Sequence, residues 1–125
     1  MLIDLEKWNK LVDRLCDKVI RDGYYKKGKV YGIPRGGCLV AMEVARRVGM
    51  DLIDKPEKGC LVVDDLIDSG VTKEKFKEYT FLALIDKQTE KEFKSKWIEF
   101  WYESTQKDDK DLVLRLAQRL NVEVN

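Results

Sequence analysis

The chain has 125 residues, of which 44% are hydrophobic and 38% charged, with 24 basic and 23 acidic side chains and no histidine. This length fits one domain over residues 1–125, and a net charge of +1 argues against nucleic-acid or membrane partners. The lack of histidine excludes histidine-based triads, histidine general bases and the usual zinc sites. Because no 18-residue apolar run and no signal peptide occur, we expect a cytoplasmic protein.

The first half of the chain predicts two helices with a strand between them. Apolar residues recur at three- and four-residue spacing after Asp4, which is placed to cap a helix, and Gly23 is placed to end it. A second periodic segment ends at Gly49. In chain order we expect a helix at 4–21, a strand at 29–33, a loop at 34–37, a helix at 38–48 and a short extended segment at 51–54.

The second half predicts further strands and helices in alternation. An apolar run before the acidic residues indicates a buried strand, and another follows a short helix. We expect a strand at 60–63, a helix at 72–78, a strand at 79–85, a polar loop at 88–96, an extended piece at 97–102 and an amphipathic helix at 111–120. Strands that alternate with helices are typical of an α/β domain with a parallel sheet.

The most informative segment runs from Cys60 to Thr72. Four apolar residues lead into Asp64 and Asp65, and then come Asp68 and the small or hydroxyl residues Ser69, Gly70, Val71 and Thr72. Ligands of open α/β sheets bind at the carboxyl ends of such strands. Carboxylates suit sugar hydroxyls or a metal, and the loop offers backbone N–H groups to a phosphate. The segment therefore predicts a ribose-phosphate site, whereas the simplest alternative is a buried strand with a solvated acidic turn.

Residues 61–72 resemble the phosphoribosyl-pyrophosphate (PRPP) signature of type I phosphoribosyltransferases. The resemblance implies a parallel-sheet α/β fold flanked by helices, with a short hood built from the C-terminal segment. In that family the loop Asp68-Ser69-Gly70-Val71-Thr72 holds the 5′-phosphate. Asp64 and Asp65 serve the ribose hydroxyls, and Asp68 lies near purine N7 as a general base.

A second motif precedes the acidic one. Residues Pro34, Arg35, Gly36 and Gly37 follow the first predicted strand and resemble the pyrophosphate loop of the same family. Glycines let the backbone approach a phosphate closely, and arginine supplies a fork of donors. Taken alone, Pro-Arg-Gly-Gly is only a turn, so its place before the acidic strand carries the interpretation.

Lys87, Trp97, Ile98 and Glu99 narrow the resemblance to xanthine–guanine and other 6-oxopurine enzymes. In those relatives a lysine contacts the 6-oxo group, an aromatic ring stacks on the base and the next backbone group reads the base edge. The resemblance further implies that Asp65 and Glu99 hold Mg²⁺ and that the protein is a homodimer or homotetramer. The alternatives are a core or interface tryptophan at position 97 and a solvated lysine at position 87.

The chain departs from the family between residues 51 and 59, which are too few for the long mobile loop that covers the family active site. We therefore expect transfer of a phosphoribosyl group from PRPP to a purine base. A non-catalytic PRPP- or nucleotide-binding regulatory protein remains the alternative. A receiver-like signalling domain and a pyrimidine substrate are weakly supported, and no GxxxxGK[ST] loop of P-loop NTPases occurs.

Overall fold

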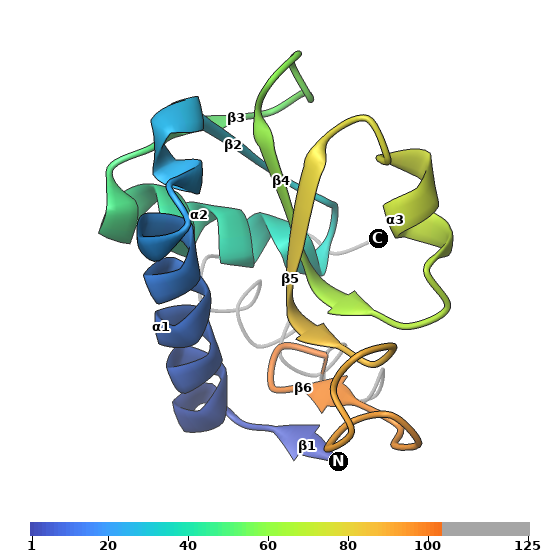
Figure 1. Cartoon of the computed structure of the whole chain (residues 1–125). Helices are drawn as coiled ribbons and strands as arrows, with labels where there is room; N and C mark the ends of the chain where they lie inside the picture. Colours follow the sequence, from blue (N-terminus) through green and yellow to red (C-terminus); the bar gives the residue numbers. More distant parts are fainter. Residues whose placement is uncertain (104–125) are drawn as a thin grey trace, which may run out of the picture.

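The computed structural model describes residues 1–103, which form a parallel sheet with helices packed around it (Figure 1). A parallel strand pair needs a long crossover connection, which the intervening helices provide. In chain order the elements are β1 Leu2–Ile3, α1 Leu5–Arg21, the 3₁₀ helix η1 Tyr24–Lys27, β2 Lys29–Gly32, α2 Gly36–Val48, β3 Asp51–Ile53, β4 Leu61–Ile67, α3 Val71–Lys75, β5 Thr80–Asp86 and β6 Glu99–Phe100.

The main sheet has the strand order β3-β2-β4-β5, and all its pairs are parallel. Helices α1 and α2 pack against each other and cover one face of the sheet (Figure 1). Phe76, which follows α3, packs against Tyr31 and Phe81 with ring centroids 6.3 and 6.2 Å apart. The α/β fold class predicted from the alternation of elements is confirmed.

The sequence pattern explains α1 directly. Asp4 accepts a hydrogen bond from the Lys7 N–H at 2.8 Å and caps the first turn. The apolar stripe of the helix is buried against the sheet and α2, and Gly23 has a positive φ of 78° just after the helix ends. The core residues contributed by α1 are Trp8, Leu11, Val12, Leu15, Cys16 and Val19.

A second, two-stranded sheet lies below the carboxyl ends of β4 and β5 in Figure 1. It pairs β1 with β6 in parallel, so that Leu2 lies opposite Glu99 and Ile3 opposite Phe100. The hood is therefore built from both the N-terminal strand and residues 97–103, and not from the later segment alone. The N-terminal strand was not predicted because two residues are too few for a periodic signal.

The largest correction concerns the acidic strand. We expected it to end at residue 63, but β4 continues through both acids to Ile67 and stays paired with β5 as far as Asp86. Asp64 and Asp65 consequently lie within the sheet and not in the loop after it. Pairing with a neighbouring strand outweighs the low strand propensity of aspartate.

Helix boundaries also differ from the predictions. Helix α2 begins at Gly36, so two glycines of the expected loop form its first turn, and α3 covers 71–75 where 72–78 was expected. Within 97–102 only β6 is extended. The helix predicted at 111–120 lies outside the described residues.

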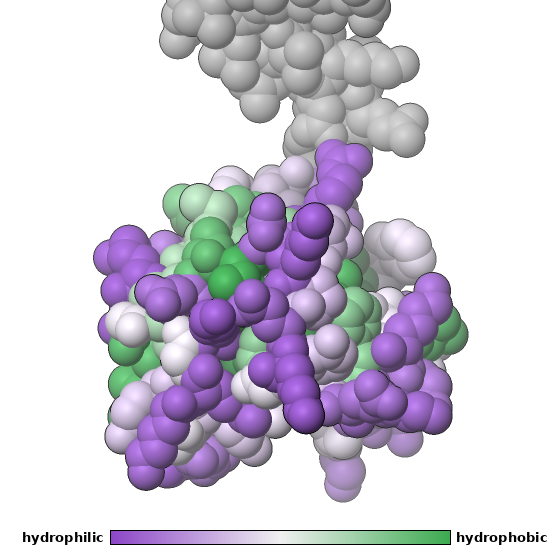
Figure 2. All heavy atoms as spheres, turned by 90° about the horizontal axis from the view of Figure 1, so that it is seen from above, coloured by the Kyte–Doolittle hydropathy of each residue, from purple (hydrophilic) through white to green (hydrophobic). Residues whose placement is uncertain are grey.

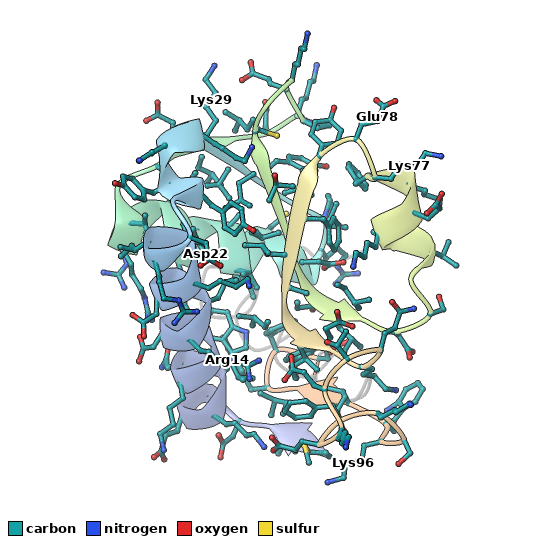
Figure 3. All side chains as sticks on the ribbon, viewed as in Figure 1. Arg14, Asp22, Lys29, Lys77, Glu78 and Lys96 are labelled. Carbon is teal, nitrogen blue, oxygen red and sulfur yellow. The ribbon has the colours of Figure 1, made fainter. Side chains whose placement is uncertain are left out.

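Charged side chains cover much of the surface, as the composition predicts. On the face shown in Figure 2, hydrophilic residues surround smaller apolar areas. Lys29, Lys77, Glu78 and Lys96 extend outward in Figure 3. Arg14 instead lies between α1 and β5, where it donates to the Leu84 carbonyl at 2.6 Å and so occupies part of the open edge of β5 (Figure 3). Within residues 1–103, no helix has both the length and the apolar character needed to span a membrane.

Candidate functional site

The predicted site residues gather around the carboxyl ends of β2, β4 and β5. Residues 34–37 follow β2, the acid pair lies in β4, and residues 68–72 follow β4. Lys87 follows β5, and its backbone N–H donates to the Ile67 carbonyl at 2.9 Å. This is the edge at which open α/β sheets bind ligands.

Helix α2 approaches the acid pair through its two leading glycines. A Cβ at Gly36 would collide with the Asp65 carboxylate. One at Gly37 would lie 2.8 Å from the Val63 carbonyl oxygen and 3.1 Å from Asp64 Cα. The glycines are therefore needed because the first turn of α2 lies directly on the backbone of β4.

Asp64 is the buried charged residue within the part of the chain that the structure describes. Its Oδ1 accepts the Asp65 backbone N–H at 2.8 Å. Burial, reinforced by the negative charge of Asp65, raises the pKa of Asp64 to about 7. Because burial favours the protonated form of Asp64, this side chain can donate a proton to a ligand oxygen.

Tyr102 enters the site from the segment after β6. Its phenol donates a short hydrogen bond to Asp65 Oδ2. Burial and the adjacent Asp65 charge raise the pKa of Tyr102, so the phenol stays protonated and acts as a donor. From the sequence, Tyr102 was predicted only as part of an extended piece, with no role in the site. No motif marks it, because 36 residues and the whole of β5 separate it from Asp65 along the chain.

The loop after β4 forms a small hollow. Gly70 has φ +88°, and Ser69 Oγ accepts the Val71 N–H at 3.4 Å. A cavity of about 100 Å³ lies here, room for a few water molecules or a small anion. Its lining includes all five predicted phosphate-loop residues, Asp68, Ser69, Gly70, Val71 and Thr72.

Two further residues belong to this hollow and were missed from sequence. Lys73 lines the same cavity and adds a positive charge one position beyond the predicted loop. Gln88 donates from its side-chain amide to the Ser69 carbonyl at 3.0 Å, across the space that a side chain at Gly70 would need. Lys73 was detectable as a cation at the loop end, whereas Gln88 follows a different strand.

Lys87 and Asp68 are brought together directly. Lys87 Nζ lies 3.2 Å from Asp68 Oδ1, with the Lys87 side chain 14% exposed and the Asp68 side chain 67% exposed. The amine is thus largely enclosed, while the carboxylate remains open to a ligand. This pair places the predicted base-contacting lysine beside the predicted general base.

The other residues predicted near the base, Trp97, Ile98 and Glu99, differ in how they are exposed and held. Trp97 is 81% exposed, so it is not a core tryptophan, and none of the aromatic contacts found within residues 1–103 includes it. Ile98 is buried in the core, which leaves only its backbone for a ligand. Glu99 lies in β6, and its backbone N–H donates to the Met1 carbonyl.

Arg35 precedes α2 at the mouth of the site. Its side chain is exposed and does not cap the helix, so the guanidinium is available to an anion. Pro34 is exposed too, and the peptide bond between these two residues is cis.

The residues fit a magnesium ion only in part. Within residues 1–103, no group of three or more acidic or cysteine side chains gathers for a metal. One carboxylate oxygen of Asp65 accepts a hydrogen bond from Tyr102, which leaves the other oxygen as a possible metal ligand. Because Mg²⁺ is often held by one or two carboxylates plus substrate phosphates, the donor set fits an ion that arrives with a phosphorylated substrate.

No protein-family model and no curated protein matches the chain. Solved structures do match its fold. A purine phosphoribosyltransferase from Pyrococcus horikoshii Ot3 matches with a TM-score of 0.56 and 20% identity, over 82% of this chain and 94% of that one. A hypothetical protein from Neisseria gonorrhoeae with bound ppGpp matches with a TM-score of 0.56 and 17% identity, over 93% and 94%.

The chain has a type I phosphoribosyltransferase-like fold. The predicted fold class is thereby confirmed. One fold hosts many functions, so the activity of the chain depends on the residues of its site.

Proposed function

We propose that the protein transfers the 5-phosphoribosyl group from PRPP to a 6-oxopurine base, releasing pyrophosphate and the nucleoside 5′-monophosphate. The observation that carries the proposal is the pairing of Lys87 with Asp68 at 3.2 Å, beside the hollow formed by residues 68–72. One wall of the site thus holds a cation and a carboxylate, and the adjoining loop suits a phosphate.

The lysine–aspartate pair matches one edge of a 6-oxopurine. In its N7–H tautomer such a base presents the O6 acceptor beside the N7 proton, whereas adenine places an amino donor where O6 would be. Lys87 would donate a hydrogen bond to O6. The 6-amino group of adenine is itself a donor and could not accept a hydrogen bond from the Lys87 ammonium. Asp68 would take or guide the N7 proton as the new bond forms at N9. The exposed ring of Trp97 is available for stacking if the base reaches it.

The acid pair would bind the ribose. As the bond from sugar C1 to pyrophosphate breaks, positive charge spreads over the ring, and a nearby carboxylate stabilises it. Asp65 would supply that charge, while Asp64, largely neutral below its pKa of about 7, would donate to a hydroxyl. The first turn of α2 closes this side of the site.

The leaving pyrophosphate would be bound by residues 34–37. Arg35 offers a fork of donors, and Gly36, which is partly exposed, lets a phosphate approach the backbone. Mg²⁺ entering with PRPP would bind Asp65, with Glu99 as a second candidate, and would offset negative charge on the pyrophosphate. A homodimer or homotetramer, a cytoplasmic location and a role in purine salvage are further parts of the proposal that rest on the family resemblance.

The test is an activity assay with defined acceptors. Purified protein is incubated with PRPP, Mg²⁺ and guanine, xanthine, hypoxanthine, adenine or orotate, and the nucleotides are separated by chromatography. We expect product with at least one 6-oxopurine and none with adenine or orotate. Product with adenine or orotate would overturn the assignment of Lys87 to O6.

A second candidate is a non-catalytic nucleotide-binding regulator. Only residues 54–60 connect β3 to β4, which leaves no long loop to cover the site, and the Neisseria gonorrhoeae protein with this fold is described with bound ppGpp. Saturable binding of ppGpp or PRPP without nucleotide formation from any base would favour this candidate.

A further inference from the structure

Tyr102 contributes to the site a group that the proposed function does not use. Its phenol is the described side-chain donor to the Asp65 carboxylate, and it comes from the hood and not from the main sheet. We propose that Tyr102 is a positioning residue for the sugar: it holds one oxygen of Asp65 so that the other stays available to a ribose hydroxyl. The inference rests on the proposed function and concerns its ribose subsite.

The Tyr102 ring is held on two sides. It stacks on Phe100 with centroids 5.4 Å apart and an interplanar angle of 4°, and Phe100 is 1% exposed. Trp101 contacts it edge-on at 5.3 Å, and Trp101 in turn meets Trp8 of α1 at 5.9 Å. A ring stacked on the buried Phe100 and contacted by Trp101 loses little freedom when its phenol forms a hydrogen bond.

The hydrogen bond between Tyr102 and Asp65 has room only because α2 begins with a glycine. A Cβ at Gly36 would lie 2.8 Å from the Tyr102 hydroxyl oxygen and would collide with the Asp65 oxygen that accepts its proton. Three elements, α2, β4 and the segment after β6, therefore meet at one hydrogen bond. Because the hood also contains β1, the contact ties the acid pair to both β1 and β6.

The chemistry of a carboxylate explains the benefit. An aspartate side chain has two acceptor oxygens and can rotate about its χ2 torsion, which is broad and roughly two-fold. A phenol on Oδ2 restricts that rotation and leaves Oδ1 in one place. A preoriented acceptor binds a sugar hydroxyl with a smaller loss of conformational entropy, and correct placement of reacting groups also speeds transfer.

In the opposite role, the Tyr102 phenol would compete with a ribose hydroxyl for Asp65. If the phenol occupied the place of a ribose hydroxyl, the sugar would have to displace it, and removing the phenol oxygen would tighten sugar binding. The buried stack on Phe100 favours positioning, since displacement would separate the ring from a core residue. The two roles predict changes of opposite sign for one substitution.

Tyr102→Phe removes the hydroxyl and keeps the stacked ring. Titration calorimetry with PRPP and with ribose 5-phosphate, each with Mg²⁺, should show about tenfold weaker binding, the usual scale for one hydrogen bond to a charged group. Inorganic pyrophosphate should bind as to the wild type, and the KM for the purine should change little. Tyr25→Phe, an exposed tyrosine of η1, is the matched control and should bind all ligands normally.

A double-substitution cycle tests whether Tyr102 acts through Asp65. In an Asp65→Ala background, Tyr102→Phe should have no further effect on ribose 5-phosphate affinity.

Gly36→Ala disturbs the same contact from the α2 side and should weaken ribose 5-phosphate binding with Tyr102 in place. This variant tests the proposal even if the Tyr102→Phe protein does not fold. Unchanged or tighter sugar binding by a folded Tyr102→Phe protein, or additive losses in the cycle, would overturn the positioning role while PRPP binding by the wild type leaves the proposed function standing. If the wild type binds no phosphoribosyl ligand, both are wrong.

Discussion

The Lys87 ammonium lies 3.2 Å from the Asp68 carboxylate, and the two residues are the next positions after β5 and β4. Ile67 pairs with Asp86 at the ends of these strands, so the parallel register brings positions 68 and 87 side by side. The register of the sheet thus creates a mixed donor–acceptor pair at the ligand edge. An enclosed amine beside an open carboxylate is a site for a ligand with adjacent acceptor and proton-bearing atoms.

Lys87→Ala should weaken base recognition selectively. The substitution removes the donor to O6 and the ion pair with Asp68, whereas residues 69–72 and the acid pair are not touched. We expect the KM for the 6-oxopurine to rise about 10–100-fold, the scale of one charge-assisted hydrogen bond, with PRPP affinity nearly unchanged. Steady-state kinetics and PRPP titration measure the two effects. Lys91→Ala, an exposed lysine in the loop after β5, is the control. An equal loss of PRPP affinity would show that Lys87 does not belong to a base pocket.

Asp68→Asn should separate chemistry from binding. The amide keeps the size of the side chain but cannot take a proton, so we expect kcat to fall about 10²-fold or more while PRPP and purine affinities stay within a few-fold. Single-turnover measurements isolate the transfer step. Asp54→Asn, in the exposed connection between β3 and β4, should leave kcat unchanged. Wild-type turnover in the Asp68→Asn protein would remove this carboxylate from the general-base role.

Gly37→Ala tests the contact between α2 and β4. In an exposed helix interior this change usually stabilises by about 1 kcal/mol. Here the new Cβ would lie 2.8 Å from the Val63 carbonyl oxygen, a strand backbone atom that cannot move aside cheaply. We expect a loss of about 1–3 kcal/mol in the free energy of unfolding, measured with urea. Met42→Ala, on the exposed side of α2, should change it by less than about 1 kcal/mol. A more stable Gly37→Ala protein would mean that α2 does not lie on the strand as described.

Much of the architecture could be predicted because the local signals agree with the final packing. The capped amphipathic helix at the N-terminus ends at Arg21 as predicted, and the alternation of strands and helices led to the parallel sheet. The end of β4 could not be predicted in this way. Its last residues include two aspartates that stay in the strand only because β5 pairs with them up to Ile67.

The candidate site could be predicted where its residues are contiguous. The contiguous residues 68–72 line one cavity, whereas the two glycines expected in a loop form the first turn of α2. Tyr102 could not be found because it reaches Asp65 only through the packing of the hood. Gln88 likewise joins Ser69 across two strand ends. Such contacts depend on register and packing, which a single sequence does not encode locally.

The pH dependence of stability should carry the signature of Asp64. Burial raises its pKa in the folded protein from 3.8 to about 7, so between these values the unfolded chain has released a proton that the folded protein still binds. Asp64 therefore lowers stability progressively as pH rises through this window, and the whole cost, up to roughly 4 kcal/mol, is present above pH 7. Asp64→Asn removes the titration while its side-chain oxygen can still accept the Asp65 N–H.

Relative to the wild type, the Asp64→Asn protein should gain stability by about 1.4 kcal/mol per pH unit between pH 5 and 7, and the gain should level off above pH 7. Urea unfolding of the ligand-free proteins in EDTA at pH 5, 6, 7 and 8 measures this difference. Asp54→Asn, at an exposed position, should give a difference that does not vary with pH. A flat profile for Asp64→Asn would mean that this carboxylate ionises in the folded protein as readily as in the unfolded chain. Asp64 then could not act as the hydroxyl donor in the ribose subsite.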